Sequence, residues 1–144
     1  NAHVDMFCVF TSADTILIGE HSGQYDKIDA AIYDRNAELL EQVRTPNGPL
    51  KVVRIPMPAR RHHDIWGGTY TNVVFLNKVL LVPTYREIEA DLQEKAFDVF
   101  RQALPGWQII GIDCSPMIIN GGALHCVTMP ILQWPAAASR VVLP

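Results

Sequence analysis

The sequence contains few cysteines and no long apolar run. Its 144 residues include three cysteines, Cys8, Cys114 and Cys126, and none of them form the Cys-x-x-Cys spacing of a structural zinc site. A sparse, odd-numbered set also does not make a disulfide framework. No run approaches the roughly 18 apolar residues that a membrane-spanning helix needs, so we expect no membrane partner.

Positive charge is also scarce. The 12 Lys and Arg residues are outnumbered by 15 Asp and Glu residues, which gives a formal net charge of -3. Proteins that bind a phosphate backbone need a basic surface, so nucleic acid is not an expected partner. The first residue is Asn, and we expect the natural N-terminus to lie upstream. No signal peptide is visible. The compartment therefore stays open, with a cytoplasmic location slightly preferred.

The apolar residues, 49% of the chain, alternate between strand and helix periods. The order strand, strand, helix, strand occurs twice: first at 4–11, 15–19, 25–44 and 52–56, then at 72–76, 79–83, 86–104 and 107–113. We therefore expect an α/β fold with ββαβ units at about 4–56 and 72–113, and a third unit beginning at about residue 121. The helices should bury Leu39, Leu40, Phe97 and Phe100. The alternative is a mixed α/β domain without internal symmetry.

His3 and Asp5 form the first candidate site. Two residues apart on the predicted strand, they should face the same side, while the apolar Val4 and Met6 face the core. Polar residues on one face and apolar residues on the other are typical of a site beside a core. The alternative is a frayed terminus with exposed polar groups.

Cys126 is the second candidate. It follows Gly121 and Gly122, and glycine lets a backbone turn sharply or pass close to a ligand. If this β-prone run is extended, neighbours face opposite ways, so His125 is not expected to act as the base for Cys126, and His3 is the natural candidate. A buried structural cysteine is the alternative, and it is the interpretation given to the other two cysteines.

Residues 57–68 form a predicted long loop. It carries two arginines, the pair His62-His63, Asp64 and Trp66. It is either a solvated connection or a lid over a nearby site. The paired histidines lack a convincing set of ligand spacings, so no metal is expected.

Three motifs resemble the agmatine deiminase and bacterial peptidylarginine deiminase family. They are residues 1–6 (NAHVDM), 70–75 (YTNVVF) and 118–128 (IINGGALHCVT), and they occur in the family's order. The resemblance implies a pentein-type fold, an α/β propeller of ββαβ repeats, that is incomplete in this chain. Ala2 stands where the family usually has Gly. The family's N-terminal half, which supplies a further carboxylate for the guanidinium, would be missing.

The resemblance also implies a reaction and a set of roles. Cys126 would attack the guanidinium carbon, and His3 would move the protons. Asp5 would hold the guanidinium, with Asn72 as a weaker candidate for a substrate contact. The substrate would be peptidyl-arginine or agmatine. The residues of the motifs are slightly closer to those of the peptidyl-arginine members. No metal or organic cofactor is expected.

Other interpretations remain open at this point. The chain could be a non-catalytic pentein-type binding or assembly module, or a fragment that is active only with the missing N-terminal half. A Cys-His hydrolase of another fold is disfavoured by the repeated ββαβ order. A homo-oligomer is possible, because a sheet edge left open by missing units is prone to pair with a second copy.

Overall fold

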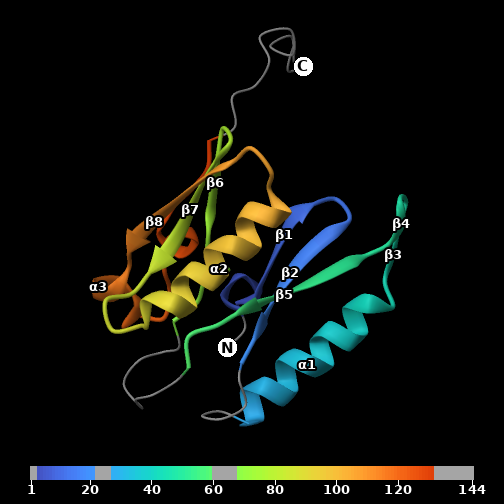
Figure 1. Cartoon of the computed structure of the whole chain (residues 1–144), viewed down its shortest axis with the longest axis horizontal. Coiled ribbons are helices and arrows are strands. Elements are labelled where there is room, and N and C mark those ends of the chain that lie inside the picture. The colour runs from blue at the N-terminus through green and yellow to red at the C-terminus, as the bar shows by residue number, and fades with distance from the viewer. Residues whose placement is uncertain (1–2, 22–26, 60–67, 132–144) are drawn as a thin grey trace, which may run out of the picture.

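A computed structural model describes residues 3–21, 27–59 and 68–131 (Figure 1). Within these residues the chain forms two three-stranded sheets, one small hairpin and several helices. This mixed α/β architecture agrees with the fold class predicted from the alternating apolar periods.

The first sheet has the strand order β1-β2-β5. Strand β1 (Cys8–Ser12) runs antiparallel to β2 (Thr15–Glu20), and β2 runs parallel to β5 (Lys51–Pro56). Helix α1 (Lys27–Glu41) makes the crossover between the parallel strands and packs against them. The hairpin of β3 (Arg44–Thr45) and β4 (Gly48–Pro49), which was not predicted, follows the helix.

The second sheet has the order β6-β7-β8 and the same strand directions. Strand β6 (Val74–Leu76) turns into β7 (Val79–Thr84) through Asn77 and Lys78, both at positive φ, as a tight two-residue hairpin turn requires. Helix α2 (Ala90–Ala103) leads to β8 (Gln108–Asp113), which is parallel to β7. Helix α3 (Ser115–Ile118) follows.

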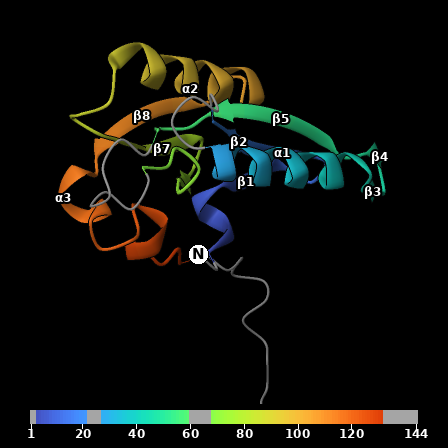
Figure 2. The same cartoon turned by 90° about the horizontal axis from the view of Figure 1, so that it is seen from below.

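One hydrophobic core joins the two sheets. It includes Leu17 and Ile55 from the first sheet, Leu80 and Val82 from the second, and Phe100 from α2. Helix α2 packs against both β5 and β8. Figure 2 shows α2 on one side of the strands, with α3 and the N-terminal turn on the other. That other side holds the candidate site.

The apolar face predicted for the first helix is wrong in part. Leu39 is 46% exposed, and Ile28 and Ile32 are also exposed, while the helix buries Ala30 and Ala37 instead. The face of α1 that packs against the core therefore carries Ala30 and Ala37, together with the partly buried Tyr33 and Leu40. In α2 the prediction is closer, because Phe100 is buried and Phe97 packs against the core.

Two predicted extended segments are also wrong. Val4–Met6 forms a 3₁₀ helix, η1, so that His3 and Asp5 do not lie on a strand, which begins only at Cys8. The run 122–129 contains no strand, and His125–Val127 forms a second 3₁₀ helix, η2. Both turns are held by contacts with distant residues, described below, that a local pattern does not reveal.

Among the described residues, no helix is long and apolar enough to cross a membrane. The predicted loop residues 60–67, with their arginines and paired histidines, lie outside the described residues.

Candidate active site

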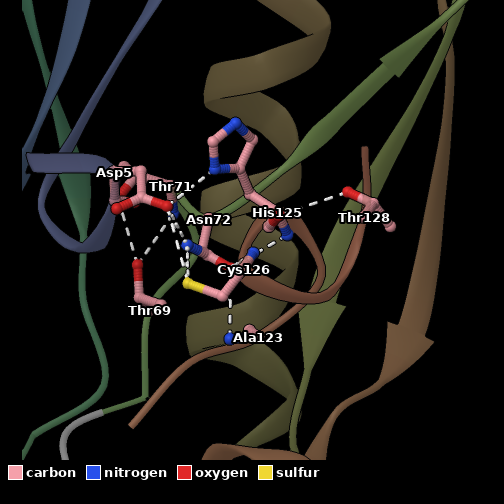
Figure 3. A network of polar contacts seen from close by, with 8 residues as sticks. All are labelled: Asp5, Thr69, Thr71, Asn72, Ala123, His125, Cys126 and Thr128. Atoms are coloured by element: carbon pink, nitrogen blue, oxygen red, sulfur yellow. Dashed lines mark hydrogen bonds and ion pairs between the residues drawn. The ribbon is translucent and has the colours of Figure 1, made fainter. Parts of the chain in front are cut away.

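Three segments far apart in the sequence meet at the candidate site. They are η1 with Asp5, the buried stretch Thr69–Asn72 before β6, and the turn that carries His125 and Cys126 (Figure 3). Each segment comes from one of the three motifs identified in the sequence.

Asn72 is fully buried and holds the Cys126 turn in place. Its side-chain oxygen accepts hydrogen bonds from the backbone N–H groups of Ala123 (3.1 Å), His125 (3.0 Å) and Cys126 (3.4 Å). These donors sit at the start of η2, where a short helix leaves N–H groups without partners in its own backbone. Asn72 therefore explains why this segment curls instead of extending.

The amide nitrogen of Asn72 faces the reactive groups. It donates to Oδ2 of Asp5 at 2.6 Å and to Sγ of Cys126 at 3.2 Å. The Cys126 thiol in turn lies 3.6 Å from the same Asp5 oxygen. One buried amide thus connects the carboxylate to the sulfur, and Asn72 lies behind the pocket.

A network of buried hydrogen bonds holds η1 in place. The hydroxyl of Thr71 donates to the backbone carbonyl of Asp5 at 3.0 Å and also contacts the hydroxyl of Thr69. The Tyr85 hydroxyl donates to the Thr69 carbonyl at 2.9 Å and accepts from its N–H at 3.0 Å. Burial raises the pKa of Tyr85, so the phenol stays protonated and keeps its donor. The backbone of Asp5 is therefore anchored to the second sheet.

The two positions before the Cys126 turn, 121 and 122, require glycine for different reasons. Gly121 has φ +86, a conformation that side chains disfavour. A Cβ on Gly122 would lie 2.6 Å from Cβ of Cys126 and 2.9 Å from its Sγ. Gly122 is thus needed because Cys126 occupies the space beside its backbone.

The three cysteines differ sharply in environment. Cys126 is exposed, whereas Cys8 and Cys114 are buried, as predicted for structural cysteines. Burial, with a further contribution from the charge of Asp5, raises the pKa of the Cys8 thiol from 9.0 to about 11. Burial also raises the pKa of Cys114, with a smaller contribution from Asp113. Of the three, Cys126 is the one placed for reaction with a solute, and the alternative of a buried Cys126 is wrong.

His3 and Cys126 lie at one open pocket, together with Val4, Asp5 and His125. The pocket has a volume of about 550 Å³ and is open to solvent. One ligand-type atom each from His3, Asp5 and Cys126 lies within 4.8 Å of the other two. Such N, O and S donors are able to hold a metal ion such as zinc, although the sequence prediction assigns no metal to the site.

The structure brings together all four residues named from the sequence, His3, Asp5, Asn72 and Cys126. It adds His125, whose Nδ1 lies 2.7 Å from Oδ2 of Asp5. The extended chain predicted at this point would direct His125 away from Cys126, whereas the 3₁₀ turn η2 brings both residues to the pocket. The signal that could have identified it is the Gly-Gly pair just before, which favours a turn.

Solved structures of deiminases are similar to this chain. A provisionally assigned arginine deiminase from Porphyromonas gingivalis is 32% identical with a TM-score of 0.75, over 88% of this chain and 37% of that one. An agmatine deiminase from C. jejuni is 25% identical with a TM-score of 0.68, over 86% of this chain and 37% of that one.

Curated relatives named as deiminases are similar to this chain in sequence. A provisionally named agmatine deiminase from Yersinia pestis is 22% identical over 150 residues, which is 91% of this chain and 40% of the relative. A protein of the same provisional name from Pectobacterium atrosepticum is 24% identical over 155 residues, with the same shares. The chain thus spans about two-fifths of the length of the curated relatives it matches.

The model of one protein family, described as Porphyromonas-type peptidyl-arginine deiminase, matches residues 1–132. That match includes η1 with Asp5, the Asn72 segment and the Cys126 turn. The chain belongs to the Porphyromonas-type peptidyl-arginine deiminase family.

Proposed function

We propose that this chain carries the reactive cysteine of an enzyme that hydrolyses a guanidinium group to a ureido group and ammonia. The observation that carries the proposal is the exposed Cys126 thiol beside the Asp5 carboxylate and His3 in one pocket. Membership of a deiminase family supports guanidino deimination in general.

The reaction has two stages. The Cys126 thiolate attacks the guanidinium carbon, which forms a C–S bond, and His3 donates a proton to the nitrogen that leaves as ammonia. His3 then removes a proton from water as it attacks the thiouronium carbon. The C–S bond breaks, and the thiolate returns with a ureido product. A covalent route is useful because resonance protects the guanidinium carbon from direct attack by water.

Asp5 binds the cation before and during attack. A carboxylate holds a planar guanidinium through short charge-assisted hydrogen bonds. Because Asp5 lies beside the Cys126 sulfur, a guanidinium bound to it brings the carbon close to the nucleophile. Asn72 is the fourth residue of the proposed site. It positions Asp5 and Cys126. A direct contact between Asn72 and the substrate stays a prediction from the family resemblance.

We expect the complete protein to supply the rest of the site. The two ββαβ segments, 4–56 and 72–113, and the stretch from about 121 belong to the C-terminal part of a pentein-type propeller. A further carboxylate from the family's N-terminal half then joins Asp5 in holding the guanidinium. Activity of this chain alone is therefore expected to be weak or absent.

The test is ammonia release by the complete natural protein. Peptide arginine, agmatine and free arginine are assayed in parallel, with Cys126→Ala as the inactive variant and Cys114→Ala as its matched control. The expected result is release from peptide arginine or agmatine, lost in Cys126→Ala and kept in Cys114→Ala. No release from any of the three substrates would instead favour a non-catalytic module of the same fold.

A further inference from the structure

His125 occupies the site beside the proposed nucleophile. In a strand, adjacent side chains point to opposite faces, but η2 is a 3₁₀ turn, in which successive residues are separated by about a third of a turn. His125 and Cys126 therefore both line the pocket. Figure 3 shows the imidazole and the sulfur reaching the Asp5 carboxylate from the same turn.

Contacts within the protein occupy the oxygen Oδ2 of Asp5. Its neighbours are Nδ2 of Asn72 at 2.6 Å, Nδ1 of His125 at 2.7 Å and the Cys126 thiol at 3.6 Å. A carboxylate oxygen offers about two lone-pair positions, and the two short contacts fill them. Within the described segments no hydrogen bond reaches Oδ1, which leaves that oxygen for a guanidinium N–H.

One of the two short contacts comes from a buried residue and the other from an exposed residue. Asn72 is fully buried and holds Oδ2 from within, whereas the His125 side chain is 55% exposed and holds it from the solvent side. The terminal torsion of an aspartate is broad, so one contact alone leaves the carboxylate free to rotate. Two contacts on one oxygen fix the carboxylate plane and the direction of Oδ1.

We infer that His125 is a positioning residue for Asp5: its Nδ1–H holds Oδ2 so that Oδ1 points to the substrate cation. This inference rests on the proposed deiminase function and adds a residue to its site. A carboxylate only accepts hydrogen bonds, so His125 must carry its proton on Nδ1. The imidazole then acts through Asp5 and takes no part in the proton transfers assigned to His3.

Two substitutions of His125 distinguish the role of its hydrogen-bond donor from the role of the imidazole ring. In His125→Asn the amide nitrogen takes about the place of Nδ1 and keeps the hydrogen bond, whereas His125→Ala removes it. In the complete protein, His125→Ala should raise KM for the guanidinium substrate by about tenfold, the usual scale for a hydrogen bond to a charged group. Its kcat should change by less than about threefold, because Cys126 and His3 are untouched.

His125→Asn should keep KM within about threefold of the natural protein. Both variants should retain the thermal midpoint, since His125 is exposed. Equal impairment of the two variants would overturn the inference, because the ring itself would then be needed. So would a large loss of kcat with KM unchanged in His125→Ala.

A second measurement does not depend on turnover. In ¹⁵N NMR of the complete protein with labelled histidine, His125 is assigned by the signal that disappears in His125→Asn. It should show the Nδ1–H tautomer, and Asp5→Ala should move it toward Nε2–H. An Nε2–H tautomer in the natural protein, or no response to Asp5→Ala, would overturn the inference even in an active enzyme. If the protein releases no ammonia, the proposed function fails, and the NMR result still decides the link between Asp5 and His125.

Discussion

Asn72 donates a 2.6 Å hydrogen bond to the carboxylate of Asp5, which lies 67 residues earlier in the chain. The opposite end of the same amide accepts from the backbone of the Cys126 turn. A single buried side chain thus sets the relative position of the proposed cation-binding group and the proposed nucleophile. This arrangement explains why three separate motifs occur together in one sequence.

Replacing Asn72 should damage stability and site together. Asn72→Ala leaves turn N–H groups and Asp5 without their partner inside the protein, so we expect a loss of about 2–3 kcal/mol in the free energy of unfolding. The exposed Asn120, which lies in the motif that carries Cys126, serves as a matched control, because its change to Ala should cost less than about 0.5 kcal/mol. Denaturant unfolding measures both, and equal losses would contradict the role given to Asn72.

The two glycines before Cys126 should respond differently to alanine. Gly122→Ala places a Cβ 2.6 Å from Cβ of Cys126 and must displace that side chain. We expect turnover to fall by at least about tenfold, because misplacing a reacting group by about an ångström is costly. Gly121→Ala faces open space and meets only the cost of its positive φ, about 1–2 kcal/mol of stability. Normal turnover in Gly122→Ala would contradict the close contact.

Alkylation should distinguish the three thiols. With iodoacetamide at about pH 8, Cys126 should react first in the native protein, because Cys8 and Cys114 are buried and burial raises their pKa. Peptide mass spectrometry gives the rate at each position. In denaturant all three should react at similar rates, which serves as the control. Native labelling of Cys114 as fast as Cys126 would argue against the described burial.

Cys8 should make the protein less stable at high pH. Its thiol has a pKa of about 11 in the folded protein, compared with the ordinary 9.0. Since the folded-state value is the higher one, its stabilising contribution is complete below about pH 9 and is lost as the pH rises toward 11. The loss should be on the order of 2 kcal/mol. Cys8→Ala should flatten this part of the stability curve, and an unchanged slope would contradict the assignment.

Local patterns predicted most of the fold. Strands β2, β5, β7 and β8 and both long helices lie within a few residues of their expected positions, because their apolar periods are repeated over several residues. The apolar face of α1 was misjudged, since Ile28, Ile32 and Leu39 share a face that is exposed. Apolar spacing shows that a face exists, but only packing shows whether it is buried.

The sequence named four residues that lie together in the structure, but it did not predict their arrangement. His3 and Asp5 were expected side by side on a strand, and they reach the pocket from a 3₁₀ turn that Thr71 anchors through the Asp5 carbonyl. His125 was set aside for the same reason, because the turn that directs it depends on Asn72. Hydrogen bonds between residues more than fifty positions apart leave no periodic trace in the sequence.

Capture of the covalent intermediate on Cys126 tests the proposed mechanism most directly. The complete natural protein is mixed with agmatine or an arginine peptide, quenched in acid during turnover, digested and examined by mass spectrometry. We expect the peptide containing Cys126 to gain the mass of the substrate minus ammonia, and Cys126→Ala to show no gain. Release of ammonia with no adduct at Cys126, or an adduct on Cys8 or Cys114 instead, would contradict the role of Cys126 as the nucleophile.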